Sequence, residues 1–147
     1  MQKTLKRPIT ISGKGLFSGG ASSITIVPAS VDTGIVFQRI DLPGTPEIPA
    51  HLEFVQESSR CTKLGSILMV EHLLSALYAY EIDNARILIS GPEIPGCDGS
   101  AKPFVDCIEN VGLEIQDKPA KYLTIEEPVF FTQGDVHLVA IPSSKFK

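Results

Sequence analysis

One stretch near the middle of the chain carries a clear helical pattern of apolar and polar positions. Residues 67–80 read Ile-Leu-Met-Val-Glu-His-Leu-Leu-Ser-Ala-Leu-Tyr-Ala-Tyr, with no glycine or proline among them. From Val70 onwards the apolar side chains recur at the i, i+3, i+4 and i+7 positions that share one face of a helix. The pattern therefore predicts a helix over residues 70–80 with one buried face.

Two chemically active side chains, Glu71 and His72, stand next to each other in the first turn of this helix. Adjacent residues on a helix point about 100° apart, so the two can approach one small site from different directions. In such an arrangement one of the two side chains can bind a metal ion and the other can act as a base beside it. A helix-capping acid followed by a solvated histidine explains the same dipeptide, and the two residues alone leave both interpretations open.

The segment before this helix has the pattern of a β-hairpin. Residues 59–64 and 67–69 are β-rich runs on either side of Gly65-Ser66, a pair that suits a type II′ turn. The second run leads directly into the helix. Arg60 and Cys61 lie on the run that pairs with it, so we expect both side chains near the helix start.

The rest of the chain predicts one more helix and several strands. Ser100 is interpreted as the N-cap of the second helix, Pro103 is tolerated in its first turn, and Gly112 ends it. Strands are expected near residues 10–11 and over 23–27, 34–40, 52–56, 85–90, 122–125, 129–131 and 136–141, with a surface loop over 41–50. This order of elements predicts an α+β fold in which helices and sheet form two layers.

Two loops contain residue types that suit either structure or function. Residues 13–20 include four glycines, which indicate a hairpin turn with positive φ or a loop that a substrate approaches closely. Asp98 lies in a Gly- and Pro-rich loop, where we expect it to bond the amides of its own loop or the helix start; a catalytic role is the alternative.

The region after residue 115 differs from the rest. Residues 116–120 read Gln-Asp-Lys-Pro-Ala, the clearest linker in the chain. The strands expected after it have no helix to cover them before Lys147. A sheet with one bare face is not stable alone, so either a partner covers it or the chain continues in nature.

Composition narrows the class of protein. A chain of 147 residues with 43% hydrophobic and 20% charged residues has the size and composition of one ordinary globular domain, and a net charge of −4 argues against nucleic-acid binding. The absence of a signal-like start and of an apolar run of about 20 residues predicts a cytoplasmic protein.

The three cysteines Cys61, Cys97 and Cys107 are expected to be reduced thiols, buried or half-buried. Only three histidines are present, and their spacing does not suggest that they converge on one metal ion.

Several short motifs together resemble a known family. They are, in order, Thr4-Leu5-Lys6-Arg7, Gly13-Lys14-Gly15-Leu16-Phe17-Ser18-Gly19, Val70-Glu71-His72-Leu73, Ile82-Asp83-Asn84, Pro92-Glu93-Ile94-Pro95 and Asp98-Gly99-Ser100-Ala101. This set closely resembles the amino-terminal half of the UDP-3-O-acyl-N-acetylglucosamine deacetylases, zinc hydrolases of lipid A biosynthesis. The chain departs from the family at Phe17, where histidine is common, and at Lys14 and Arg60. The change at Phe17 puts in doubt a polar role for that position.

The resemblance implies an organisation and a set of roles. Residues 1–116 would form the first of two similar domains with the active site at their junction, residues 117–120 the linker, and residues 121–147 the opening strands of the second domain. His72 would be the first of three zinc ligands and Glu71 the general base, while a His and an Asp from the missing carboxy-terminal half would complete the metal site. Cys61 and Arg60 would lie near the site, and a buried thiol without a role is the alternative for Cys61.

The implied reaction is hydrolysis of the N-acetyl group of UDP-3-O-acyl-N-acetylglucosamine to acetate and a free amine. Zinc would activate a water molecule and polarise the amide carbonyl, and Glu71 would accept the proton of the water. As given, we expect the chain to be inactive alone, because one protein ligand does not make a catalytic zinc site. Two alternatives remain: a non-catalytic binding or scaffold domain of the same fold, and complementation by a separate chain.

Overall fold

The computed structural model describes residues 1–44 and 47–144 and confirms the α+β class. The two helices are α1 (Val70–Ala79) and α2 (Lys102–Val111), and a short 3-10 helix, η1, spans Leu52–Phe54. The strands are β1 (Lys3–Leu5), β2 (Ile9–Lys14), β3 (Ala21–Pro28), β4 (Ile35–Arg39), β5 (Ile48–Pro49), β6 (Val55–Gln56), β7 (Lys63–Leu64), β8 (Ile67–Leu68), β9 (Ala85–Ser90), β10 (Leu113–Ile115), β11 (Val129–Gln133) and β12 (Val136–Ala140).

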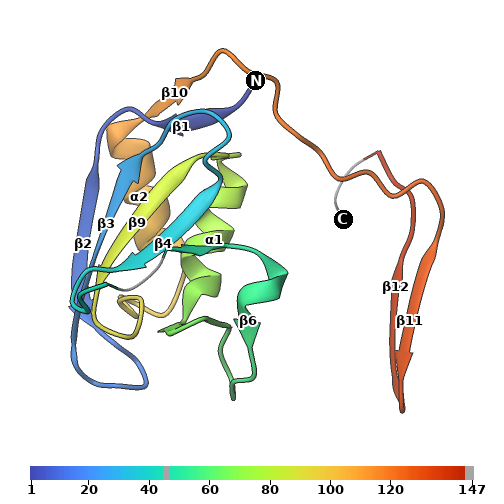
Figure 1. Ribbon diagram of the computed structural model, residues 1–147, viewed down its shortest axis with the longest axis horizontal. Helices are drawn as coiled ribbons and strands as arrows, with labels where there is room; N and C mark the ends of the chain where they lie inside the picture. The colour runs from blue at the N-terminus through green and yellow to red at the C-terminus, as the bar shows by residue number, and fades with distance from the viewer. Residues whose placement is uncertain (45–46, 145–147) are drawn as a thin grey trace.

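A five-stranded sheet with the order β2-β3-β9-β4-β5 forms one layer of the structure. Its neighbours pair antiparallel except β4 and β9, which run parallel. The chain between these two parallel strands contains α1, and both helices lie over the same face of the sheet (Figure 1). This arrangement is the two-layer sheet/helix architecture expected from the sequence.

The core lies between the sheet and the helices. Helix α1 buries one face, as its periodicity predicts, and α2 contributes two buried side chains. These buried helical residues are Val70, Leu73, Ala76 and Leu77 from α1 and Phe104 and Ile108 from α2. They pack in one cluster with inward-facing sheet residues such as Ile24, Ile26, Phe37, Ile87 and Ile89. Burial of this apolar surface fixes α1, and therefore its first turn, against the sheet.

Two smaller sheets complete the body of the fold. Strands β6, β7 and β8 form a three-stranded antiparallel sheet, and the turn between β7 and β8 contains Gly65 at φ 54°. The following residue has no positive φ, which fits the predicted type II′ geometry. At the other end of the molecule, β1 pairs with β10 (Figure 1).

Several sequence predictions require correction. The strand expected over residues 52–56 is a 3-10 turn followed by a two-residue strand, and residues 122–125 are not a strand. Strand β1 was not expected; it exists because β10, more than 100 residues away in sequence, supplies its hydrogen-bonding partner. The predicted loop over residues 41–50 contains β5, and its residues 45 and 46 lie outside the described residues, as do residues 145–147 at the end of the predicted strand region.

The predicted helix cap at Ser100 is also wrong by one position. Ala101 is the N-cap of α2, and its side chain has no oxygen to accept a hydrogen bond from the helix. Ser100 Oγ instead accepts a hydrogen bond from Lys102 N at 3.1 Å, one residue ahead of the usual capping geometry. The other end of the helix agrees with the prediction, because Gly112 is the C-cap with φ 73°.

The last part of the described chain is a hairpin with exposed apolar side chains on both faces. Strands β11 and β12 pair over five residues each and form a two-stranded sheet of their own, which stands apart from the main body in Figure 1. Its exposed large apolar residues are Val129, Phe130, Phe131, Val136, Leu138, Val139 and Ile141. A two-stranded sheet with no covering layer is marginal in water, so these strands need further surface to pack against.

Candidate functional site

A sharp turn from strand to helix places Glu71 and His72. Strand β8 ends at Leu68, Met69 follows in the left-handed conformation with φ 64° and ψ 35°, and α1 begins at Val70. A non-glycine residue in this conformation is unusual and costs backbone energy. Met69 is held there because its side chain is buried in the core. The turn leaves no loop between the hairpin and the helix, so the first turn of α1 sits directly beside the hairpin.

The carboxylate of Glu71 is oriented by this hairpin. Its Oε2 accepts a hydrogen bond from Thr62 N at 3.0 Å, and Val70 N donates to Thr62 O at 3.4 Å. The side chain is half-buried. One carboxylate oxygen is thereby fixed to the backbone, while Oε1 has no hydrogen-bond donor among the described residues. A carboxylate held in this way can accept a proton at its second oxygen.

The imidazole of His72 is half-buried on the same turn. In the part of the chain that the structure describes, neither ring nitrogen has a hydrogen-bond partner; only the backbone carbonyl of His72 is engaged, by Ser75 Oγ at 2.9 Å. A partly exposed imidazole with both nitrogens available can act as a metal ligand. The geometry therefore allows His72 to bind a metal ion beside the carboxylate of Glu71.

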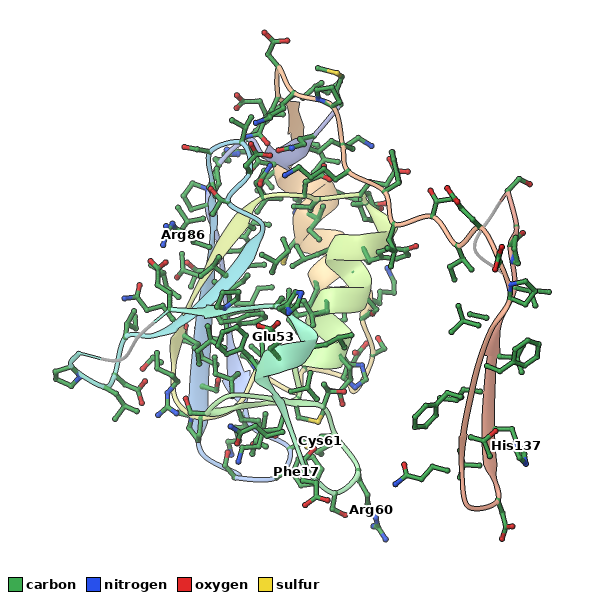
Figure 2. The ribbon with its side chains drawn as sticks, turned by 45° about the vertical axis from the view of Figure 1, so that its right-hand side comes forward. Phe17, Glu53, Arg60, Cys61, Arg86 and His137 are labelled. Atoms are coloured by element: carbon green, nitrogen blue, oxygen red, sulfur yellow. The ribbon has the colours of Figure 1, made fainter. Side chains whose placement is uncertain are left out.

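The two other predicted site residues lie on the hairpin turn before β7. Cys61 is half-buried against the core and its carbonyl accepts a hydrogen bond from Ser58 Oγ, whereas Arg60 is exposed with φ 61°. Cys61 is next to Thr62, whose backbone contacts Glu71 and Val70 at the helix start. The β-run predicted over residues 59–64 is shorter in the structure, because β7 spans only Lys63–Leu64 and leaves Arg60 and Cys61 outside the strand. In Figure 2 the Arg60 side chain extends outward beyond Cys61 at the end of the molecule.

The glycine-rich loop between β2 and β3 lies at the same end of the molecule (Figures 1 and 2). It closes on itself through Gly15 N to Gly20 O at 2.9 Å and Gly19 N to Gly15 O at 3.0 Å. Phe17, at the tip of the loop, is 49% exposed. The loop is a tight hairpin connection with Gly19 at positive φ, as one of the two interpretations predicts.

A buried carboxylate that the sequence did not single out supports this loop. Glu93 is 0% exposed, and its Oε1 and Oε2 accept hydrogen bonds from Phe17 N at 2.8 Å and Ser18 N at 2.9 Å. Burial by itself raises the pKa of Glu93, but the backbone N–H groups of Phe17 and Ser18 and the hydroxyl of Ser18 stabilise the anion more strongly. The pKa of Glu93 is therefore lowered below its usual value. In the sequence, the signal available for a buried carboxylate was the position of Glu93 between Pro92 and Pro95 and next to Ile94.

The remaining candidate residues have local roles. Asp98 Oδ1 accepts hydrogen bonds from Ser100 N at 2.9 Å and Ser100 Oγ at 2.8 Å, which confirms the expected structural use of this side chain. All three cysteines are free thiols, but Cys97 is exposed, contrary to the expectation that all would be at least half-buried. Cys97 lies in the loop between β9 and α2, with φ 49°.

The described residues do not bring together enough donor side chains for a complete metal site. Across residues 1–44 and 47–144, no group of three or more His, Cys, Asp or Glu side chains is close enough to hold a metal ion. A catalytic zinc site takes three protein ligands, and in this region His72 can offer one. The residues described here therefore fit one ligand position of such a site and not the whole of it.

Two hollows of the surface lie away from these residues. One of about 440 Å³ lies between the C-terminal end of α1 and residues 120–122, and a smaller one of about 180 Å³ adjoins it near Asp32 and Asn84. A ten-residue helix is about 15 Å long, so the first hollow is at the opposite end of α1 from Glu71. Neither hollow contains a predicted site residue.

Comparison with known proteins identifies clear relatives. The model of the family described as "LpxC: UDP-3-O-acyl N-acetylglycosamine deacetylase" matches residues 2–147. A UDP-3-O-acyl-N-acetylglucosamine deacetylase of Bdellovibrio bacteriovorus is 41% identical over 146 residues, covering 97% of this chain and 48% of the relative. The protein of the same name from Pseudomonas entomophila is 45% identical over 150 residues, covering 99% of this chain and 50% of the relative.

One further relative, whose name includes a second enzyme, is similar to nearly the whole of this chain. The "Bifunctional enzyme LpxC/FabZ" of Chlorobaculum tepidum is 41% identical over 152 residues, covering 99% of this chain and 32% of the relative. The chain thus spans about half the length of the deacetylases it matches and about a third of the bifunctional enzyme.

Proposed function

This chain belongs to the UDP-3-O-acyl N-acetylglycosamine deacetylase family, and on that premise we propose that it is the amino-terminal part of a zinc-dependent deacetylase. The substrate would be UDP-3-O-acyl-N-acetylglucosamine, and hydrolysis of its N-acetyl amide would give acetate and a free amine in lipid A biosynthesis. The observation that carries the proposal is the juxtaposition of a backbone-held Glu71 carboxylate and an available His72 imidazole on the first turn of α1.

In the proposed site, His72 supplies one ligand to zinc and Glu71 acts as the general base. Zinc, when bound, supplies Lewis-acid activation of water and of the amide carbonyl. Glu71 suits the base role because Thr62 N fixes Oε2 and leaves Oε1 for the incoming proton. The adjacent position of the two residues keeps base and ligand on one turn of a helix whose opposite face is buried in the core.

The remaining zinc ligands would come from a carboxy-terminal half of the same protein. The relatives are about twice as long as this chain, and the described residues contain no second and third donor beside His72. The apolar hairpin β11–β12 also requires a covering layer. We therefore assign residues 1–116 to a first domain, residues 117–120 to a linker and residues 121–147 to the opening strands of a second.

We propose that Arg60 and Cys61 lie near the site without a chemical role. Cys61 adjoins Thr62, and Arg60 extends from the same turn. We propose a cytoplasmic location. Helices α1 and α2 are each ten residues long, and within the described residues no helix has the length and apolarity needed to cross a membrane.

The test is acetate release from the UDP-sugar by the full-length protein, with and without a zinc chelator. We expect activity that chelation abolishes and added zinc restores. Glu71→Ala and His72→Ala should each lower turnover by orders of magnitude while circular dichroism shows the same fold. His51→Ala is the matched control, because His51 is exposed at the N-cap of η1 and, among the described residues, its imidazole has an ion-pair contact only with Glu53. Rates like those of the wild type in both site variants would overturn the assignment; a zinc-independent wild type would overturn the proposed chemistry.

A further inference from the structure

Glu93 links the two segments that meet at the candidate site. Its carboxylate accepts N–H groups of Phe17 and Ser18 in the glycine loop. Its backbone lies beside β8: Leu68 N donates to Pro92 O at 2.9 Å, and Ile94 N donates to Leu68 O at 3.0 Å. Leu68 is followed by Met69 and then by the first turn of α1. One buried residue therefore connects the loop to the strand that places Glu71 and His72.

The loop packs closely around this carboxylate. A Cβ atom on Gly15 would overlap both Ser18 Oγ and the carboxylate of Glu93, so residue 15 must be glycine while these two side chains occupy their places. A Cβ on Gly13 would lie 3.3 Å from Pro95 Cβ, and Gly96 N donates to Lys14 O at 2.9 Å. Residues 13–18 thus lie against residues 93–96 along their length.

The loop presents apolar side chains to solvent at this end of the molecule. Leu16 is 69% and Phe17 49% exposed, although the backbone beneath them is fixed. A rigid backbone that carries exposed apolar side chains suits a binding surface, because little conformational entropy is lost when a ligand covers it. The substrate of the proposed function has an acyl chain and sugar rings with apolar faces, which such side chains can contact.

We propose that Glu93 is a positioning residue, which holds the loop of residues 15–20 as a wall of the substrate site beside Glu71 and His72. This inference rests on the proposed function. Glu93 itself is sealed from solvent and acts only through the loop. The role is one of substrate binding and not of chemistry, so it affects KM and leaves kcat and zinc content close to their wild-type values.

The test compares Glu93→Gln with the wild type in the full-length protein. The amide keeps the shape of the side chain but offers one acceptor oxygen in place of two, so its NH2 group faces one of the two N–H donors. We expect KM for the UDP-sugar to rise roughly tenfold, with kcat within about threefold and zinc content unchanged. Hydrogen exchange of residues 15–20 should become faster. Glu114→Gln on β10 is the matched control, because Glu114 is exposed at the opposite end of the molecule.

A merely structural role of Glu93 gives a different result. Partial unfolding would lower the active fraction and therefore apparent kcat, without changing KM. That result, or an unchanged KM with unchanged exchange of the loop, would overturn the inference. If Glu93→Gln does not fold, Phe17→Ala decides, because its exposed side chain can be removed without loss of core packing: a raised KM supports the substrate-binding wall, and an unchanged KM overturns it. An inactive wild type would instead refute the proposed function, so the two failures are distinguishable.

Discussion

The carboxylate of Glu71 and the backbone N–H of Thr62 are joined by a hydrogen bond of 3.0 Å. This contact ties the first turn of α1 to the hairpin that precedes it, and Val70 N strengthens the connection by donating to Thr62 O at 3.4 Å. The carboxylate is therefore oriented before any ligand binds. Such preorganisation is what a general base requires, since a base that must first be ordered loses part of its advantage.

Replacement of Glu71 and replacement of His72 should affect turnover and zinc content differently. Glu71→Gln removes the base but leaves the proposed zinc ligand, so we expect kcat to fall by roughly 10²–10⁴ with zinc content retained. His72→Ala removes a ligand, so zinc content should fall together with activity. Metal analysis of the purified full-length variants, alongside acetate release, checks this difference. Equal zinc loss in both variants would show that Glu71 is a ligand and not a base.

The left-handed backbone of Met69 makes a testable contribution to stability. Met69→Ala removes a buried side chain and should lower the free energy of unfolding by about 2–5 kcal/mol. Met69→Gly removes slightly more side chain, yet glycine adopts φ 64° without the cost of about 1 kcal/mol that other residues bear. We therefore expect the glycine variant to be at least as stable as the alanine variant, reversing the usual order. Urea denaturation of the 147-residue chain measures both; a clearly less stable glycine variant would contradict the explanation.

The ion pair between Arg39 and Asp41 stabilises the end of β4. Arg39 is 8% exposed, and its Nε and Nη2 donate to the two oxygens of Asp41 at 2.7 and 2.6 Å. Asp41→Asn leaves a nearly buried guanidinium without its counter-charge, and we expect the free energy of unfolding to fall by about 1–3 kcal/mol. The guanidinium of Arg39 lowers the pKa of Asp41 to about 2, so the wild-type pair should persist until the pH approaches that value. Glu114→Gln, a similar charge removal at an exposed site, should change stability little.

Glu93 should make stability depend on pH in the acid range. Its pKa in the folded protein lies below the ordinary value of 4.5, because the amides of the glycine loop overcome the effect of burial. The contribution of the carboxylate is therefore complete above about pH 4.5 and is lost as the pH falls through the lower, native pKa. The difference in unfolding free energy between the wild type and Glu93→Gln should shrink over this range. Denaturation at a series of pH values measures it, and a difference that stays constant down to pH 3 would contradict the assignment.

The sequence by itself determined the elements whose signals are local. The period of apolar residues in 70–80 and the glycine at 112 fixed the helices, because burial of one helical face and a positive φ leave their mark within a few residues. The Gly65-Ser66 turn and the adjacent Glu71 and His72 were visible for the same reason.

Only the tertiary structure decided which distant groups meet. The carboxylate of Glu93 binds amides 75 and 76 positions earlier in the chain, and β1 exists through pairing with β10 more than 100 residues away. No local sequence pattern indicates either contact, because hydrogen bonds between remote segments depend on how the sheet and helices pack. The left-handed turn at Met69 and the hydrogen bond from Thr62 N to Glu71 likewise arise from packing. They orient the adjacent Glu71 and His72, which in the sequence are only a common dipeptide.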